Sequence, residues 1–94
     1  MTAVKDYLDE RQEKLEFFTK AITNAHGKNH PEVFDVRDEY VKLQLALDAK
    51  DNLDDNFAEL RQTTNNYAIP NDVCPVFEAT YHMLETADAI NAQA

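Results

Sequence analysis

The sequence predicts an all-α protein in which four amphipathic helices form an up-down-up-down bundle, as one domain over residues 1–94. Glycine occurs once and proline three times, so the chain has few natural breakpoints, and their spacing suits helices better than strands. Between the breakpoints, apolar residues recur three, four and seven positions apart, which is the period of one helix face. A chain of this length forms one hydrophobic core and has no room for a deep enclosed active site.

The first helix is predicted over residues 2–25. Its core face consists of apolar residues at helical spacing, namely Val4, Leu8, Leu15, Phe18 and Ile22. We expect Gly27 to end this helix in the left-handed conformation, because glycine alone lacks the Cβ that resists positive φ. A tight turn over residues 26–29 then leads to the second helix.

The second helix is predicted over residues 31–49, since Pro31 suits a first helical position where its missing N–H would have no partner. Its core stripe consists of Val33, Val36, Tyr40, Leu43 and Leu47. A second apolar stripe, formed by Phe34, Val41 and Leu45, is displaced around the helix axis. Two explanations stay open: this stripe is a homodimer surface, or a central helix with a wide apolar arc contacts two neighbours.

The third helix is predicted over residues 52–66, where Asp51 and Asp54 resemble a capping box with a shorter acid. Its core face consists of Leu53, Phe57, Leu60 and Thr64.

The fourth helix is predicted over residues 72–90, with Asp72 as its N-cap and Pro75 in its first turn. Its inward face consists of Val73, Phe77, Tyr81 and Leu84. A loop over residues 65–72 precedes it, because asparagine, aspartate and proline favour turns there.

The chain is acidic, with 18 Asp and Glu residues against nine Lys and Arg and a formal net charge of −9. This surplus repels phosphate backbones and anionic membrane surfaces, so we expect no nucleic-acid and no membrane partner. Serine is absent and the one glycine is isolated, which excludes serine nucleophiles and glycine-rich phosphate loops.

One cysteine cannot close an intrachain disulfide or form a CxxC zinc site, which favours a reducing compartment. The N-terminal segment lacks an apolar stretch long enough for a signal peptide or a membrane span. We therefore expect a cytoplasmic protein.

The candidate metal ligands are His26, His30 and Glu32, because imidazole and carboxylate groups bind transition metals. Three donors on a turn would form an open, weak and pH-dependent site. The alternative for His26 is an interaction with the negative C-terminal end of the first helix, and for His30 a place in the next helix cap.

The other polar candidates have structural explanations. Glu32, Asp35, Asp38 and Glu39 could complete a metal shell with oxygen ligands, but Glu32, Asp35 and Glu39 share a helix face that is expected to be solvated. His82 is expected as a partly buried packing residue. Cys74 is either an activated thiol at a helix N-terminus or a buried, inert one. The tyrosines at positions 40, 67 and 81 are expected in the core, with hydroxyls that reach a partner.

The chain resembles the hemerythrin-like domain of the di-iron proteins that repair damaged iron-sulfur clusters, particularly a short stand-alone form. The resemblance lies in AHGKNHPEVFDVRDEY, over residues 25–40, and FAELRQTTNNYAIPNDVCPVFEATYHMLE, over residues 57–85. Its most specific part is the run TTNNY, followed at matching intervals by Pro70, Cys74 and Tyr81. The resemblance implies a hemerythrin-like four-helix bundle, a cytoplasmic setting and a stress-response link to damaged iron-sulfur enzymes.

The di-iron ligand set of those relatives does not carry over in full. Their bundles hold two irons with histidines from all four helices and carboxylates from HxxxE motifs. Only His26 matches one of these histidines; the second helix has no histidine after His30, Lys50 stands near a ligand position, and no terminal HxxxE precedes Ala94. One histidine cannot hold a di-iron centre.

We therefore expect an accessory or binding protein linked to iron-sulfur cluster repair or iron handling, with weakly held iron at His26, His30 and Glu32. Its partner would be an iron-sulfur protein, another protein or a second copy. The alternative is a metal-free helical interaction or dimerising adaptor protein that uses the second apolar stripe. Catalysis is the least supported, because no nucleophile and base pair with suitable spacing is present.

Overall fold

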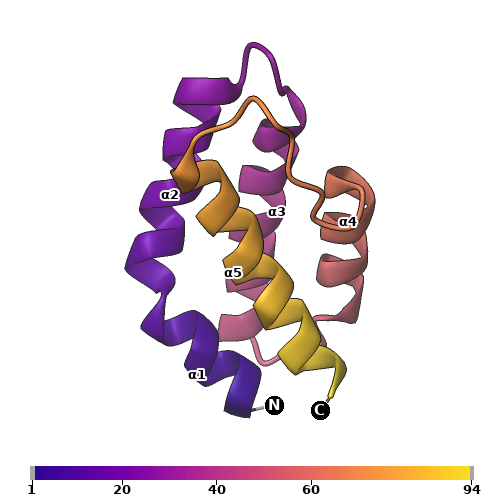
Figure 1. Ribbon diagram of the computed structural model, residues 1–94. Helices are drawn as coiled ribbons and strands as arrows, with labels where there is room; N and C mark the ends of the chain where they lie inside the picture. The colour runs from indigo at the N-terminus through magenta and orange to yellow at the C-terminus, as the bar shows by residue number, and fades with distance from the viewer. Residues whose placement is uncertain (1, 94) are drawn as a thin grey trace.

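The computed structural model describes residues 2–93 and contains, within them, five α-helices and no strand. The helices are α1 (Thr2–Glu10), α2 (Gln12–His26), α3 (Glu32–Asp48), α4 (Asp54–Thr64) and α5 (Pro75–Ala92) (Figure 1). The all-α prediction is therefore confirmed. In this part of the chain, no helix has the length and apolar character needed to cross a membrane.

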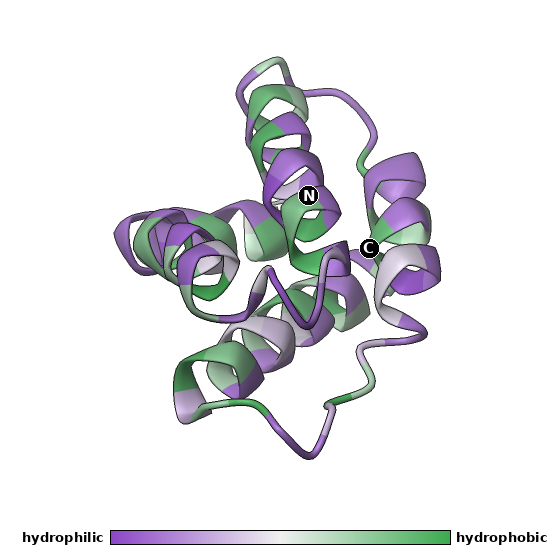
Figure 2. Ribbon diagram, turned by 90° about the horizontal axis from the view of Figure 1, so that it is seen from above, coloured by the Kyte–Doolittle hydropathy of each residue, from purple (hydrophilic) through white to green (hydrophobic). Residues whose placement is uncertain are grey.

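The helices α2, α3, α4 and α5 form a ring in which each contacts the next, and α1 lies against α5 (Figures 1 and 2). The start of α1 and the end of α5 lie at one end of the molecule (Figure 1). The α2–α3 turn and the upper part of the α4–α5 loop lie at the other end, which we call the loop end. The candidate site residues are at the loop end.

The core is formed by one face of each helix, and the hydropathy colours of Figure 2 alternate along the helices accordingly. The aromatic and aliphatic side chains predicted for the inward faces of α3, α4 and α5 are almost all fully buried. The largest of them are Tyr40, Phe57, Phe77 and Tyr81. The second apolar stripe of α3 lies outside this core, as described below.

The predicted single helix over residues 2–25 is wrong, because the chain breaks at Arg11 into α1 and α2. Arg11 has φ −110° and ψ 10°, and its N–H bonds to the Leu8 carbonyl at 3.2 Å. The Arg11 guanidinium donates to the Tyr7 carbonyl at 3.3 Å and lies 3.8 Å from the centroid of the Tyr7 ring. A side chain thus replaces part of the helical hydrogen bonding and stabilises the break by a cation–π contact.

The core face of α2 also differs from the prediction at one position. Phe18 is only partly buried, whereas Thr19 is fully buried, and its hydroxyl donates to the Leu15 carbonyl at 2.7 Å. This intrahelical bond satisfies the hydroxyl, so a threonine is tolerated in the core.

The predicted left-handed conformation of Gly27 is wrong, because this residue is right-handed, with φ −57° and ψ −30°. Glycine is needed there for space, since a Cβ would lie 2.6 Å from the Phe34 ring. The left-handed residues are instead Lys50 and the run from Asn65 to Tyr67 after α4. Asparagine tolerates this conformation, whereas Tyr67 is held in it by burial and hydrogen bonds.

Both predicted helix caps also differ. Residue Leu53 precedes α4, and the Asn52 carboxamide oxygen accepts from the Asp54 N–H at 2.7 Å, so the Asp51 capping box does not form. The N-cap of α5 is Cys74, and Asp72 lies two residues further out. The Asp72 carboxylate contacts His30 instead.

Candidate functional site

Three segments meet at the loop end and bring the predicted metal ligands close together. The last turn of α2 carries His26, the turn that follows carries His30, and α3 begins with Glu32. The end of the α4–α5 loop contributes Asp72 and Cys74. The two imidazole ring centroids lie 6.4 Å apart, and both rings pack edge-on against Phe77.

Both ring nitrogens of His30 face carboxylates. Its Nε2 lies 2.8 Å from Asp72 Oδ1, and its Nδ1 lies 3.2 Å from Glu32 Oε2. An imidazole donates from both nitrogens only when it is protonated, so this arrangement favours the imidazolium form. His30 therefore joins the loop before α5 to the start of α3.

The electrostatics follow from these contacts. The hydrogen bond that His30 donates to Asp72 raises the pKa of His30 above its usual 6.5, and Glu32 adds to the effect. The same hydrogen bond lowers the pKa of Asp72 below its usual 3.8. Each group thus favours the charged form of the other.

The second imidazole, His26, is paired with the cysteine. Its Nε2 lies 3.2 Å from Cys74 Sγ and accepts a longer hydrogen bond, of 3.4 Å, from the Cys74 N–H. Cys74 is partly buried and packs against the core, which lies between the two states that the sequence left open. His26 serves as an outside partner for the first turn of α5, where backbone N–H groups lack helical acceptors.

These contacts do not form a metal centre as they stand. Within residues 2–93, no three His, Cys, Asp or Glu side chains are placed to hold one metal ion. His26 Nε2 faces Cys74, and both nitrogens of His30 face carboxylates, so His26, His30 and Glu32 do not point at one position. A di-iron centre, which needs donors from facing helices, does not fit these residues.

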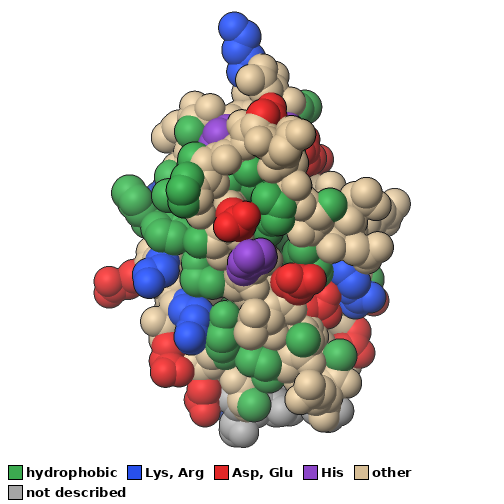
Figure 3. Space-filling model, viewed as in Figure 1, with side chains coloured by type: hydrophobic (Ala, Val, Ile, Leu, Met, Phe, Trp, Pro, Cys, Tyr) green, Lys and Arg blue, Asp and Glu red, His purple; other side chains and the backbone are tan. Residues whose placement is uncertain are grey.

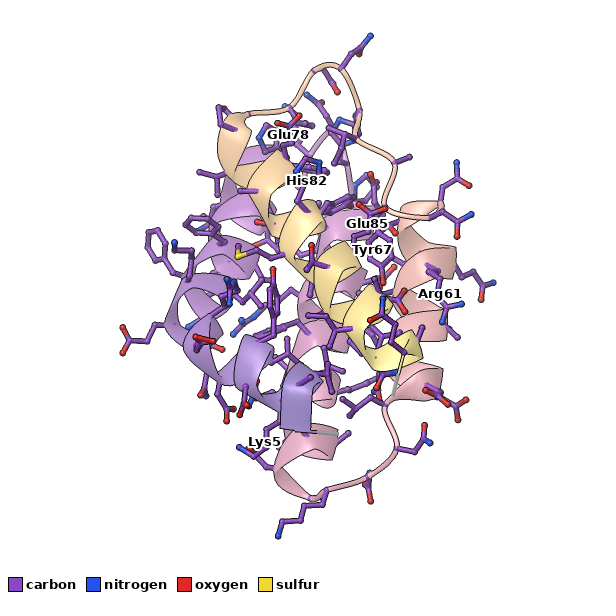
Figure 4. All side chains as sticks on the ribbon, turned by 60° about the horizontal axis from the view of Figure 1, so that its bottom comes forward. Lys5, Arg61, Tyr67, Glu78, His82 and Glu85 are labelled. Carbon is purple, nitrogen blue, oxygen red and sulfur yellow. The ribbon has the colours of Figure 1, made fainter. Side chains whose placement is uncertain are left out.

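The other polar residues considered from the sequence differ in how far they are exposed. Asp35 is exposed as expected and Asp38 is also exposed, but Glu39 is only 7% exposed, which contradicts the solvated-face prediction. The Asn56 carboxamide donates to Glu39 Oε2 at 2.9 Å from the neighbouring α4 and compensates this burial. His82 is exposed rather than partly buried and projects from α5 between Glu78 and Glu85 (Figure 4).

Sequence reasoning missed an ionic contact between the exposed Arg61 of α4 and the buried Asp88 of α5. Asp88 is 9% exposed and accepts from Arg61 Nε at 2.9 Å and from the Tyr67 hydroxyl at 2.8 Å. Arg61 and Tyr67 lie on the α4 side of α5 in Figure 4. The position of Asp88 within an apolar stretch of α5 was the only available signal.

The expectation that every core tyrosine hydroxyl finds a partner is wrong for Tyr81. Within the described residues, its buried hydroxyl has no hydrogen-bond partner. Tyr67 satisfies the expectation through Asp88, and Tyr40 has a long contact of 3.5 Å with Gln44.

Two apolar areas lie outside the core. On α3, the side chains of Phe34, Val41 and Leu45 are 51%, 39% and 65% exposed. We call them the α3 outer face, and their exposure excludes the explanation in which the stripe packs against neighbouring helices. On α2, Phe17 is 68% exposed, and apolar side chains gather over this helix in Figure 3, whereas acidic ones are scattered.

Comparison with known proteins identified no similar protein. No family model matches the chain, and no curated protein and no solved structure matches it either. The resemblance to the hemerythrin-like domain therefore stays a prediction.

Proposed function

We propose that the protein is a helical interaction module that forms a homodimer through the α3 outer face. The supporting observation is the exposure of Phe34, Val41 and Leu45 on one side of a helix whose opposite side fills the core. They follow each other at intervals of seven and four residues, which sets them in one line along α3. Covering these side chains in a dimer removes apolar area from water.

The charges beside the α3 outer face favour a second copy as the occupant. In an antiparallel pair of identical helices, the same flank of each helix meets its counterpart across the two-fold axis. A crossing centred near Tyr40 sets Asp38 of one copy opposite Lys42 of the other, twice. The same register brings Phe34 of one copy close to Leu45 of the other.

This register makes the interface self-complementary in a chain whose net charge of −9 otherwise opposes association. Two opposite-charge pairs and six apolar side chains would meet, while most acidic residues remain outside the contact. The proposed dimer should therefore strengthen at higher salt, as the repulsion between the two acidic chains is screened.

Sedimentation velocity of wild type, Leu45→Glu and Phe17→Glu tests this proposal. The Leu45 variant places a charge beside Phe34 of the other copy, in the apolar part of the interface, and should be monomeric. The control, Phe17→Glu, also replaces an exposed apolar residue by glutamate, but on α2, and should leave the dimer unchanged. A wild-type monomer at high micromolar concentration would exclude the homodimer.

A second proposal is the iron-linked accessory role that the resemblance implies, in a hemerythrin-like bundle. It is supported by the gathering of His26, His30, Glu32 and Cys74 at the loop end, since these side-chain types bind divalent metals. Metal binding would require His30 to leave Asp72, so the site would be weak and would weaken further at low pH.

Titration with ferrous and zinc ions tests this second proposal independently of the homodimer. A double variant, His26→Ala with His30→Ala, should lose the metal binding that wild type shows. His82→Ala is the matched control, because it removes an exposed histidine from α5, away from the loop end. Equal binding by wild type and the double variant would exclude this site, and tightly held iron with a di-iron spectrum would overturn the argument from missing ligands.

A further inference from the structure

The unpartnered hydroxyl of Tyr81 belongs to a surface groove at the loop end. The side chain is 1% exposed, and its buried oxygen has no hydrogen-bond partner within residues 2–93. A buried hydroxyl without a partner is unfavourable by about 1–3 kcal/mol, so its presence calls for an explanation. Thr80, its neighbour on α5, satisfies its own hydroxyl through the Val76 carbonyl.

The groove has a volume of about 380 Å³ and lies between the start of α3, the end of α4 and the loop that follows. This volume is in the range of small-molecule sites. Tyr81 is the one α5 residue in its wall. Its side chain therefore reaches the wall of the groove from α5, while its hydroxyl oxygen stays buried behind that wall.

The wall combines an acidic part with an apolar part. Glu32 and Thr63 supply a carboxylate and a hydroxyl, and Ile69 and Pro70 supply an apolar surface beside them. Among the described residues, no lysine or arginine lines the groove. The Glu32 carboxylate raises the pKa of the Tyr81 phenol further than burial does alone, which places negative potential at the hydroxyl.

We propose that this groove binds a small organic cation, a primary ammonium group on a short aliphatic chain. The ammonium is a donor of three hydrogen bonds and carries the charge that Glu32 attracts. The Tyr81 oxygen is closed to solvent in the free structure, so a small shift of the groove wall is needed before one of the ammonium N–H groups supplies the partner that this oxygen lacks. The aliphatic chain covers Ile69 and Pro70, while the net charge of −9 raises the local concentration of cations.

The His30 contact leaves Glu32 able to take part. A carboxylate has two oxygens and about four acceptor positions, and His30 uses one of them through Oε2. An anionic ligand would meet Glu32 without a compensating cation in the wall, so the groove selects against carboxylates and phosphates.

The probe is n-butylammonium chloride, with 1-butanol and sodium butyrate as neutral and anionic analogues of similar size. Binding is followed by ¹H–¹⁵N chemical shifts of the intact chain. We expect saturable shifts in residues 63–70 for the ammonium only. Equal binding of butanol or butyrate, or no saturable shift at tens of millimolar, would overturn the proposal.

Two variants identify the groups that bind. Tyr81→Phe removes the hydroxyl and leaves the ring, and it should weaken butylammonium binding about tenfold, as loss of a hydrogen bond to a charged group does. Glu32→Gln should weaken it to a similar extent. The matched control is Tyr40→Phe, which removes another buried tyrosine hydroxyl whose ring does not line the groove.

Thermal unfolding of each variant shows whether it folds. Should Glu32→Gln fail to fold, Tyr81→Phe alone decides, because it removes a single unpartnered atom. Unchanged affinity in Tyr81→Phe would overturn the assigned role of the hydroxyl.

Discussion

Two tyrosines at different positions in this small helical protein offer a direct test of what a buried hydroxyl contributes to stability. Tyr67 and Tyr81 are both almost fully buried, at 6% and 1% exposure. The Tyr67 hydroxyl donates to Asp88 at 2.8 Å, whereas the Tyr81 hydroxyl has no partner in the described part of the chain. Replacing each by phenylalanine removes one oxygen atom and no packing carbon.

The two substitutions should change the free energy of unfolding in opposite directions. Tyr67→Phe takes a hydrogen bond from a buried carboxylate and should lower the free energy of unfolding by about 2 kcal/mol, although Arg61 still binds Asp88. In a domain of this size, that corresponds to a fall of about 10 °C in melting temperature. Tyr81→Phe removes an unsatisfied group and should raise the free energy of unfolding by up to about 1 kcal/mol.

Urea unfolding followed by far-UV circular dichroism measures both variants against wild type. The slope of the free energy of unfolding against urea concentration should be the same in all three proteins, because the surface exposed on unfolding hardly changes. If Tyr81→Phe were as destabilising as Tyr67→Phe, the Tyr81 hydroxyl would have a partner, and the reasoning from the unpartnered atom would fail.

Two further predictions concern the core and the His30 contacts. Leu60 is fully buried, so Leu60→Ala should lower the free energy of unfolding by about 2–5 kcal/mol; a change below about 0.5 kcal/mol in urea titrations would contradict its place in the core. The pKa of His30 is raised and that of Asp72 lowered, so their contribution to stability is complete between about pH 4 and 6.5. It should be lost as the pH rises above 6.5 through the folded-state pKa of His30, and as the pH falls below 3.8 through that of Asp72. In urea titrations from pH 5 to 9, the stability difference between wild type and His30→Gln should shrink with rising pH, and a constant difference would contradict the ion pair.

Helix periodicity predicted the parts of the fold that depend on local pattern. The stripe that runs through Val36, Tyr40 and Leu43 fills the core, and the displaced stripe that includes Leu45 lies outside it. Both follow from the angle between successive side chains on a helix, which the sequence alone determines.

The features that sequence reasoning missed depend on contacts between distant segments. His30 and Asp72 are 42 residues apart, and nothing near Asp72 distinguishes an ion-pair partner from an N-cap. The break at Arg11 depends on the packing of a side chain over Tyr7, without a glycine or proline to mark it. Glu39 has the spacing of an outer-face residue and is buried because α4 brings Asn56 against it.

The loop between α4 and α5 is held by polar contacts at both of its ends. Near α4, the Tyr67 hydroxyl binds Asp88, which holds the residue in a left-handed conformation that is unfavourable for an aromatic side chain by about 1–2 kcal/mol. Near α5, Asp72 binds His30 and Cys74 contacts His26. A segment fixed at both ends keeps Ile69 and Pro70 in place as one wall of the Tyr81 groove. The polar contacts at the loop end therefore stabilise the α4–α5 loop without a metal ion. If His30 left Asp72 to bind a metal ion, the loop would lose one of these contacts, and Ile69 and Pro70 would be held less firmly.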